Sequence, residues 1–200
     1  MITLVVNTYR HANFKRTAEI KQALANNKAN PYLRIVTVGE HKDSSDHWLT
    51  SQQPTYKNLI DIANNYNGVK IIANADIYFD LTIRLAATIK EKEVYCLARY
   101  EDGVLKDRPD SQDAWIWRGT MRLNGGNYHL GRAGSDNRLA YELRQSGYRV
   151  LNPAKTIKAH HLHASQQRDP KKRVTVPPPY LTISPHELTT HSDCKTPAVT

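Results

Sequence analysis

Three short apolar runs, separated by stretches with helical spacing, constrain the fold of this chain more than any other feature. The runs are residues 2–6 (ITLVV), 32–40 (YLRIVTVGE) and 69–73 (VKIIA). Between them, residues 13–26 and 56–65 place apolar side chains near the spacing of one helix face. Strands alternating with helices are typical of a parallel sheet with right-handed crossovers. We therefore expect an α/β fold, with a mostly parallel central sheet flanked by helices.

The remaining residues extend this pattern and then change character. We expect a helix at 81–92, strands at 93–100 and 114–117, a glycine-rich loop at 119–134, a helix capped by Ser135 or Asp136 and ended by Gly147, and short strands at 148–151 and 156–159. Basic residues and then prolines dominate after His163. We therefore predict one domain over 1–165. The tail, 166–200, is expected to lie extended on that domain or to be partly disordered.

The balance of charges points to anionic partners. Among 200 residues, 28 are Lys or Arg and 19 are Asp or Glu, which gives a net charge of +9. Such an excess suits nucleotide phosphates, nucleic acid or a membrane surface, although a basic chain can simply be soluble. No apolar run approaches the ~20 residues of a membrane-spanning helix, so we expect a cytoplasmic protein. Cys96 and Cys194 lack the spacing of a zinc site or a disulfide framework.

Polar residues at the end of the third apolar run form the first candidate site. Asn74 and Asp76 follow this predicted strand, and Asp80 lies four residues further on. In an open α/β sheet, ligands gather at the carboxyl ends of the strands. Amide and carboxylate oxygens there suit a hard divalent cation that bridges phosphates. The alternative is an ordinary turn after a strand, which both residue types favour.

Two further groups carry side chains suited to chemistry. Asp136, at the start of the best-defined helix, is either a helix cap or an acid able to take a proton from a hydroxyl group. Three histidines follow in His160-His161-Leu162-His163, where His161 and His163 would share one face of a strand and could hold a metal ion. Lone histidines in strands are usually structural.

Two tryptophans share a face of the predicted strand 114–117. Trp115 and Trp117 are expected to belong to the core, with stacking on a sugar or base as the functional alternative.

Several segments, in order, resemble a known family. They are LVVNTYR (4–10), IIANADIYFD (71–80), QDAWIWRG (112–119), a long motif from LGRAGSDN to HLHAS (130–165), and PPPY (177–180). Together they resemble small glycosyltransferases of the GT-A fold, the type often encoded by bacteriophages and large viruses. The resemblance spans roughly residues 1–180 and implies a Rossmann-like domain that binds a nucleotide sugar.

The resemblance also implies roles for single residues. Donor-binding positions would be Thr8, Tyr9, Arg10, Asn74, Ala75 and Asp76. On chemical grounds, Lys155 or Lys158 near the C-terminal strands is a further candidate, because a basic side chain stabilises the departing diphosphate. Asn74 and Asp76 occupy the place of the DxD motif, which holds Mn²⁺ or Mg²⁺ on the diphosphate, and His161 or His163 resembles the late histidine that completes the metal shell. The first DxD position is Asn rather than Asp, which removes a charge and puts tight metal dependence in doubt.

By the same resemblance, Asp136 would be the catalytic base of an inverting enzyme, and Asp113 would lie near the donor sugar or the acceptor. The donor would be a nucleoside-diphosphate sugar, with UDP the commonest nucleotide for this fold.

Three acceptors are compatible with the sequence. The net charge and the basic segment 168–173 favour DNA carrying a hydroxymethylated base such as 5-hydroxymethylcytosine, flipped out and stacked on Trp115, Trp117 or Tyr128. A surface polysaccharide or other glycan is the alternative within the family, and a protein acceptor has nothing in its favour. Outside the family, a non-catalytic nucleic-acid-binding protein would explain the charge but not the segment NADIYFD.

Overall fold

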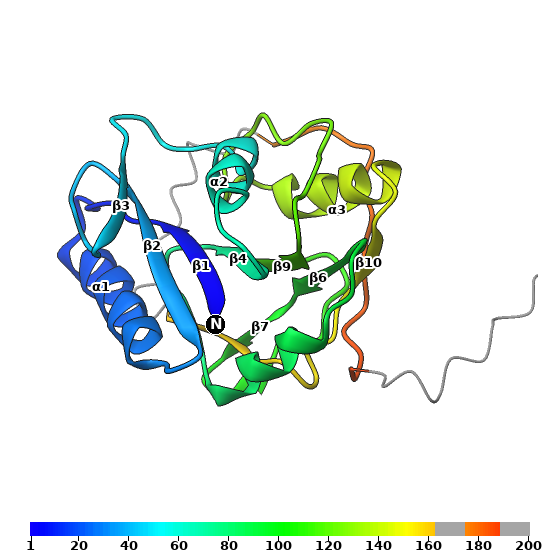
Figure 1. The fold of residues 1–200 in the computed structure, drawn as a ribbon, viewed down its shortest axis with the longest axis horizontal. Coiled ribbons are helices and arrows are strands. Elements are labelled where there is room, and N and C mark those ends of the chain that lie inside the picture. The colour runs from blue at the N-terminus through cyan, green and yellow to red at the C-terminus, as the bar shows by residue number, and fades with distance from the viewer. Residues whose placement is uncertain (163–174, 189–200) are drawn as a thin grey trace, which may run out of the picture.

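The computed structural model describes residues 1–162 and 175–188. A seven-stranded sheet runs through its centre, in the order β10-β6-β9-β4-β1-β2-β3 (Figure 1). Six of these strands run in one direction, and β9 runs antiparallel between β4 and β6. The strands are β1 (Ile2–Asn7), β2 (Leu33–Gly39), β3 (Asp46–Leu49), β4 (Val69–Ala73), β6 (Glu93–Leu97), β9 (Ala114–Arg118) and β10 (Arg149–Leu151).

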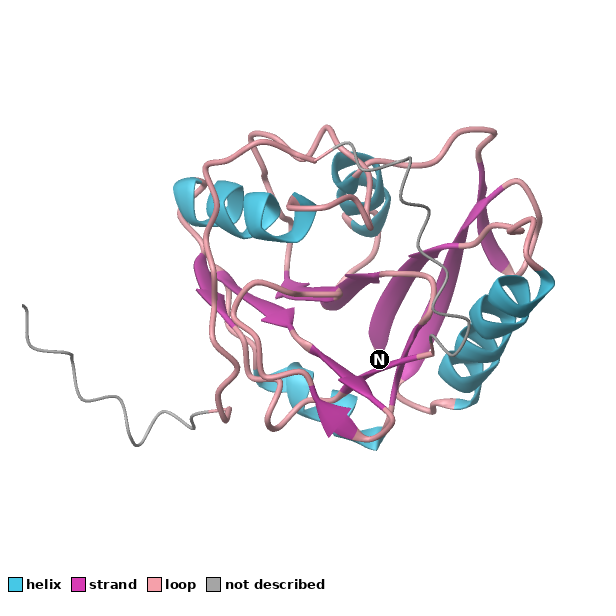
Figure 2. Cartoon of the chain, turned by 180° about the vertical axis from the view of Figure 1, so that it is seen from behind, coloured by secondary structure: helices cyan, strands magenta, loops and turns pink. Residues whose placement is uncertain are grey.

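Helices cover both faces of this sheet (Figures 1 and 2). They are α1 (Phe14–Ala29), α2 (Tyr56–Ala63), α3 (Ser135–Gln145) and the 3-10 helix η1 (Leu81–Thr88). Alternating residues of β1 point to opposite faces, because the side-chain period of a strand is two. Leu4 and Val6 join the core beneath α1 and η1, whereas Val5 joins the core beneath α2. The predicted α/β class, with a mostly parallel sheet flanked by helices, is confirmed.

A second, four-stranded sheet packs on the α1 and η1 side, in the order β5-β11-β7-β8. Its strands are β5 (Ile77–Phe79), β7 (Arg99–Glu101), β8 (Val104–Leu105) and β11 (Ala159–His161). This sheet brings the sequence around His161 beside the exit of β4, since His161 pairs with Ile77 and the N–H of Leu162 donates to the carbonyl of Asp76.

Four local predictions differ from the structure. The strand expected at 156–159 is absent over residues 156–158, and β11 begins only at Ala159. Residues 81–88 form a 3-10 helix rather than an α-helix. The strand expected at 93–100 is interrupted, with β6 in the large sheet and β7 in the small one. Helix α3 is capped by Gly134, which has φ of 75° and offers no side-chain cap, so Ser135 and Asp136 lie inside the first turn. A side chain at Gly134 would collide with Val176 and Tyr180, which pack against it.

The described part of the C-terminal tail lies along the domain. Backbone N–H groups of Leu181, Ile183 and His186 donate to carbonyls of Asn137, Pro109 and Asn152, respectively. Among the described residues, no helix has the length and apolar character needed to span a membrane.

Candidate functional site

The strand exits of β1 and β4 and the start of β9 lie side by side. The register pairs Val6 of β1 with Ala73 of β4, and Ala73 with Ala114 of β9. The residues that follow or precede these pairs, namely 7–10, 74–76 and 113, therefore meet at one edge of the sheet. This is the edge at which ligands gather in α/β folds.

The loop after β1 holds the predicted donor-binding residues Thr8, Tyr9 and Arg10. Thr8 is buried, and its N–H donates to the carbonyl of Val38 in β2. Gly39 permits this approach, because a Cβ there would lie 2.2 Å from the Thr8 carbonyl oxygen. Tyr9 is 42% exposed and Arg10 is exposed. A rigid, buried threonine is thus followed by two side chains accessible to a ligand.

Asp76 is paired with an arginine and a histidine. The carboxylate is 3% exposed, and its Oδ2 atom lies 2.5 Å from a guanidinium nitrogen of Arg16 and 2.7 Å from Nε2 of His161. Burial alone would raise the pKa of Asp76, but the hydrogen bond and charge of His161, together with Arg16, lower it to about 2. Asp76 is therefore ionised at any physiological pH.

Helix α1 fixes the position of Arg16. Asn13 caps this helix, and its side-chain oxygen accepts a hydrogen bond from the backbone N–H of Arg16. The guanidinium also contacts Glu19 at 3.2 Å and the carbonyl of Leu162 at 3.4 Å. A cation is thus anchored in the first turn of α1, directly against the residue that the sequence singles out as a metal ligand.

Asn74 faces Asp113 instead of Asp76. Its amide nitrogen donates a hydrogen bond of 2.6 Å to Oδ1 of Asp113. Oδ2 of the same carboxylate lies 2.9 Å from Arg99, which also pairs with Glu101 at 2.7 Å. Both oxygens of Asp113 are therefore engaged by donors that hold it in one orientation.

A chain of polar contacts links the two aspartates. Glu101 pairs with Arg99 and lies 3.4 Å from Nδ1 of His161, whose Nε2 reaches Asp76. Polar contacts thus run continuously from Asp113 to Asp76.

Sequence reasoning missed Arg16, Arg99 and Glu101. The one available signal was that residues 99 and 101 alternate onto the same face of a strand.

Asp136 lies near Asp113, because its side chain accepts a hydrogen bond from the residue that precedes Asp113. Its Oδ2 accepts a hydrogen bond of 3.2 Å from the backbone N–H of Gln112, and its Oδ1 accepts one of 3.0 Å from Asn137. Burial raises the pKa of Asp136 to about 6 against these two hydrogen bonds, and the negative charge of Asp113 contributes to the rise. A carboxyl with a pKa near neutrality can both accept and hold a proton.

The residues predicted to hold a divalent cation do not form a cation site as arranged here. Asp76 and His161 meet, but Arg16 already neutralises the carboxylate, and the amide N–H of Asn74 is turned toward Asp113. His163 lies outside the described residues. Within residues 1–162 and 175–188, no group of three His, Cys, Asp or Glu side chains could hold a metal ion. Asp80 caps η1 and pairs with His160 at 3.0 Å, apart from Asp76.

The two tryptophans and the lysine that were predicted to bind a ligand contact other parts of the protein. Trp115 and Trp117 are 1% and 0% exposed in the core beneath α2 and α3, and Trp115 packs edge-on against Tyr56 at 4.8 Å. Their burial excludes the predicted stacking of either tryptophan on a base. Tyr128 is half-buried and stays a candidate for such stacking. Lys155 pairs with Asp107 at 3.5 Å, and its backbone N–H donates to His186 of the tail.

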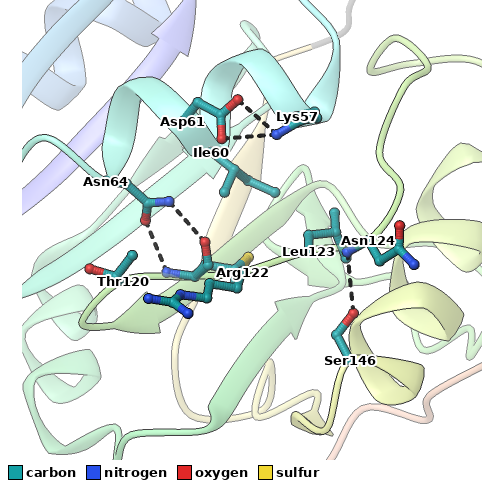
Figure 3. A pocket seen from close by; sticks show the side chains of 10 residues that line it. Lys57, Ile60, Asp61, Asn64, Thr120, Arg122, Leu123, Asn124 and Ser146 are labelled. Carbon is teal, nitrogen blue, oxygen red and sulfur yellow. Dashed lines mark hydrogen bonds and ion pairs between the residues drawn. The ribbon is translucent and has the colours of Figure 1, made fainter.

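An open pocket of about 580 Å³ lies on a different part of the surface, between α2 and the loop after β9 (Figure 3). Asn64 bridges its walls through hydrogen bonds with both backbone groups of Met121, and Lys57 pairs with Asp61 on its rim. Asn64 and Met121 follow the end of α2 and the end of β9, at the sheet edge opposite Asp113. None of the predicted site residues lines this pocket.

No protein-family model and no curated protein matches the chain. Two solved structures of residues 1–349 of S. aureus TarS are similar. One aligns with a TM-score of 0.49 and 11% identity, and covers 80% of this chain and 60% of the TarS chain. The other, TarS in complex with UDP-GlcNAc, aligns with a TM-score of 0.43 and 10% identity, and covers 98% and 61%. The chain thus spans about three fifths of the TarS chains that it matches.

Proposed function

We propose that this protein is a glycosyltransferase that moves a sugar from a nucleoside-diphosphate donor to an acceptor hydroxyl group. The observation that carries the proposal is the convergence at one sheet edge of a carboxyl with a pKa near neutrality and a second, oriented carboxylate. These are Asp136 and Asp113. Both residues also lie in the sequence segments that resemble GT-A glycosyltransferases.

Each of the two carboxylates receives a role. Asp136 takes the proton of the acceptor hydroxyl as the acceptor oxygen forms its bond to the anomeric carbon of the sugar. The bond from that carbon to the phosphate oxygen breaks, and its electron pair leaves with the nucleoside diphosphate. Attack opposite the leaving group inverts the anomeric carbon. Asp113, held by Asn74 and Arg99, orients the sugar or acceptor hydroxyls.

The donor is assigned to the loop after β1. Thr8, Tyr9 and Arg10 follow the first strand, where a nucleotide lies in many α/β folds. We take UDP as the first nucleotide to test. Lys155 is assigned to the donor only as a basic side chain able to offset the charge of the diphosphate.

For the acceptor we propose DNA with a hydroxymethylated base. The net charge of +9 supports a polyanion, although the basic segment 168–173 lies outside the described residues and two of the three proposed stacking side chains are buried. Activity on such DNA is expected to fall steeply with added salt, since phosphate contacts release counterions. Turnover on a neutral glycan that is indifferent to salt would favour the polysaccharide acceptor instead.

Release of the nucleoside diphosphate from nucleotide sugars, with and without acceptors, tests the reaction class. Asp136→Asn keeps the size of the side chain and one acceptor oxygen but removes the base, so kcat is expected to fall about 10²- to 10⁴-fold with donor affinity nearly unchanged. Asp61→Asn, on the exposed face of α2, is the matched control. Equal rates for wild type and Asp136→Asn would contradict the assignment of the base.

A further inference from the structure

We propose that the guanidinium group of Arg16 takes the place of the divalent cation at the donor site, so that the diphosphate binds without metal. The inference rests on the proposed function and concerns how the same site neutralises its donor. It starts from the disagreement between the residues expected to hold Mn²⁺ or Mg²⁺ and the contacts that these residues make.

The first step is the occupancy of Asp76. A single oxygen, Oδ2, receives both Arg16 at 2.5 Å and His161 at 2.7 Å. A metal bound to this oxygen would have to displace one of these donors and would then lie beside a fixed positive charge. Because like charges repel strongly in a site with little water, the guanidinium opposes entry of a divalent cation.

The second step concerns the other expected ligands. Asn74 is uncharged, whereas the DxD motif has an aspartate at this position. The side-chain amide of Asn74 donates its hydrogen bond to Asp113. Asp113 is itself paired with Arg99. Asp76 and Asp113, the two carboxylates in contact with the predicted cation ligands, therefore each already have an arginine as counterion.

The third step is what the arginine offers to a diphosphate. Arg16 lies in the first turn of α1, which follows the donor loop 8–10, and its side chain is 14% exposed. Asp76 and Glu19 hold the guanidinium plane in one orientation. A planar guanidinium pairs with phosphate oxygens through several N–H donors at once and always carries its charge. A diphosphate that displaces Glu19 and the Leu162 carbonyl from Arg16 would gain these donors, and Arg16 would then offset part of its charge without a metal ion.

Binding of UDP, GDP, CDP and ADP to the full chain, measured by calorimetry in EDTA and again in Mn²⁺, tests this inference. We expect one diphosphate to bind with nearly the same Kd in both conditions. Binding that requires Mn²⁺ would overturn the inference but leave the proposed function standing. Binding of no diphosphate in either condition would overturn the proposed function and the inference with it.

Two variants separate the arginine from the metal. Arg16→Gln is expected to weaken the diphosphate about 10- to 100-fold in EDTA, with no rescue by Mn²⁺. Asp76→Asn retains an acceptor for Arg16 and His161 and removes the charge that competes with phosphate, so it should bind at least as tightly as wild type. Loss of binding in Asp76→Asn is the result expected for a metal ligand, and it would overturn the inference.

Lys21→Ala is the matched control, because Lys21 is an exposed cation on the same helix. It is expected to leave the Kd unchanged. A loss equal to that of Arg16→Gln would show that the net charge of α1, and not the position of Arg16, governs binding, which would also overturn the inference. Circular dichroism of each variant confirms that it is folded.

Discussion

The side-chain amide of Asn74 donates a hydrogen bond of 2.6 Å to the carboxylate of Asp113, and the backbone N–H of Asn74 donates to the Asp113 carbonyl at 3.0 Å. The pair joins the exit of β4 to the entry of its antiparallel neighbour β9. An amide at position 74 is therefore a requirement of the site itself, because a carboxylate there would face another carboxylate at hydrogen-bonding distance.

Asn74→Asp is expected to destabilise the protein by about 1–3 kcal/mol at pH 7, because it buries a repulsive pair in place of a hydrogen bond. The repulsion raises the carboxyl pKa of the pair in the folded state. The loss should therefore shrink as the pH falls and one of the two groups takes a proton. Urea unfolding at pH 7 and pH 4 measures the difference, with Asn67→Asp on the exposed loop before β4 as control. Equal stability of Asn74→Asp and wild type at pH 7 would contradict this account.

Asp136 is expected to cost stability at neutral pH. Its folded pKa of about 6 lies above the ordinary value of 3.8, so its contribution is fully favourable below about pH 4 and is lost as the pH rises through 6. Asp136→Asn does not titrate at this position, so its free energy of unfolding relative to wild type should rise by about 2–3 kcal/mol between pH 4 and pH 7. At pH 4 no gain should remain, and the variant should be less stable than wild type, because its single amide oxygen cannot accept both backbone hydrogen bonds. A gain that is constant with pH would contradict the raised pKa.

The same carboxyl predicts the pH dependence of the rate. A general base must be deprotonated, so kcat should rise with pH and level off above about pH 6, the folded pKa of Asp136. Bound donor can shift this midpoint, because a nearby diphosphate disfavours the carboxylate. Initial rates at saturating donor between pH 5 and 8 measure it. A rate that falls steadily across this range would contradict the assignment.

Glu142 is expected to hold the glycine-rich loop against α3. Its carboxylate accepts hydrogen bonds from the N–H of Gly126 at 2.8 Å and the hydroxyl of Tyr128 at 2.9 Å, and it pairs with Arg138. Glu142→Ala leaves these donors unpaired and should cost about 2–4 kcal/mol of stability. Glu142→Gln, which keeps the acceptor oxygen, should cost less than half of that. Equal losses in thermal unfolding would show that the hydrogen bonds contribute little.

The sequence predicts the elements whose periodicity is strong. The run 69–73 coincides with β4, and the helical spacing after Asn13 coincides with α1, because buried strands and amphipathic helices each impose a regular apolar pattern. The short strands β3, β5 and β8 escape prediction, since two to four residues are too few for a period to appear. The antiparallel direction of β9 depends on its neighbours and leaves no local signal.

The candidate site was predictable only in part. Asp76, His161, Asp113 and Asp136 were recognised because they lie at strand exits or a helix start, and the structure brings them to the same region. Their arginine partners were not. Arg16 is 60 residues from Asp76 in the chain, and Arg99 is 14 residues from Asp113. Nothing local distinguishes such an arginine from a solvated one until the sheet order is known.

Thermal unfolding of the protein with UDP, GDP, CDP and ADP tests the central claim, a nucleoside-diphosphate site at the edge formed by β1, β4 and β9, most directly. A diphosphate at about 100 times its Kd should add about 2.7 kcal/mol to the free energy of unfolding. We expect this shift with one of the four nucleotides and a reduced shift in Arg10→Ala, with Arg84→Ala, on the exposed side of η1, unchanged. Absence of a shift with every diphosphate, beside a clear shift with unmodified DNA, would contradict the claim and support a nucleic-acid-binding protein.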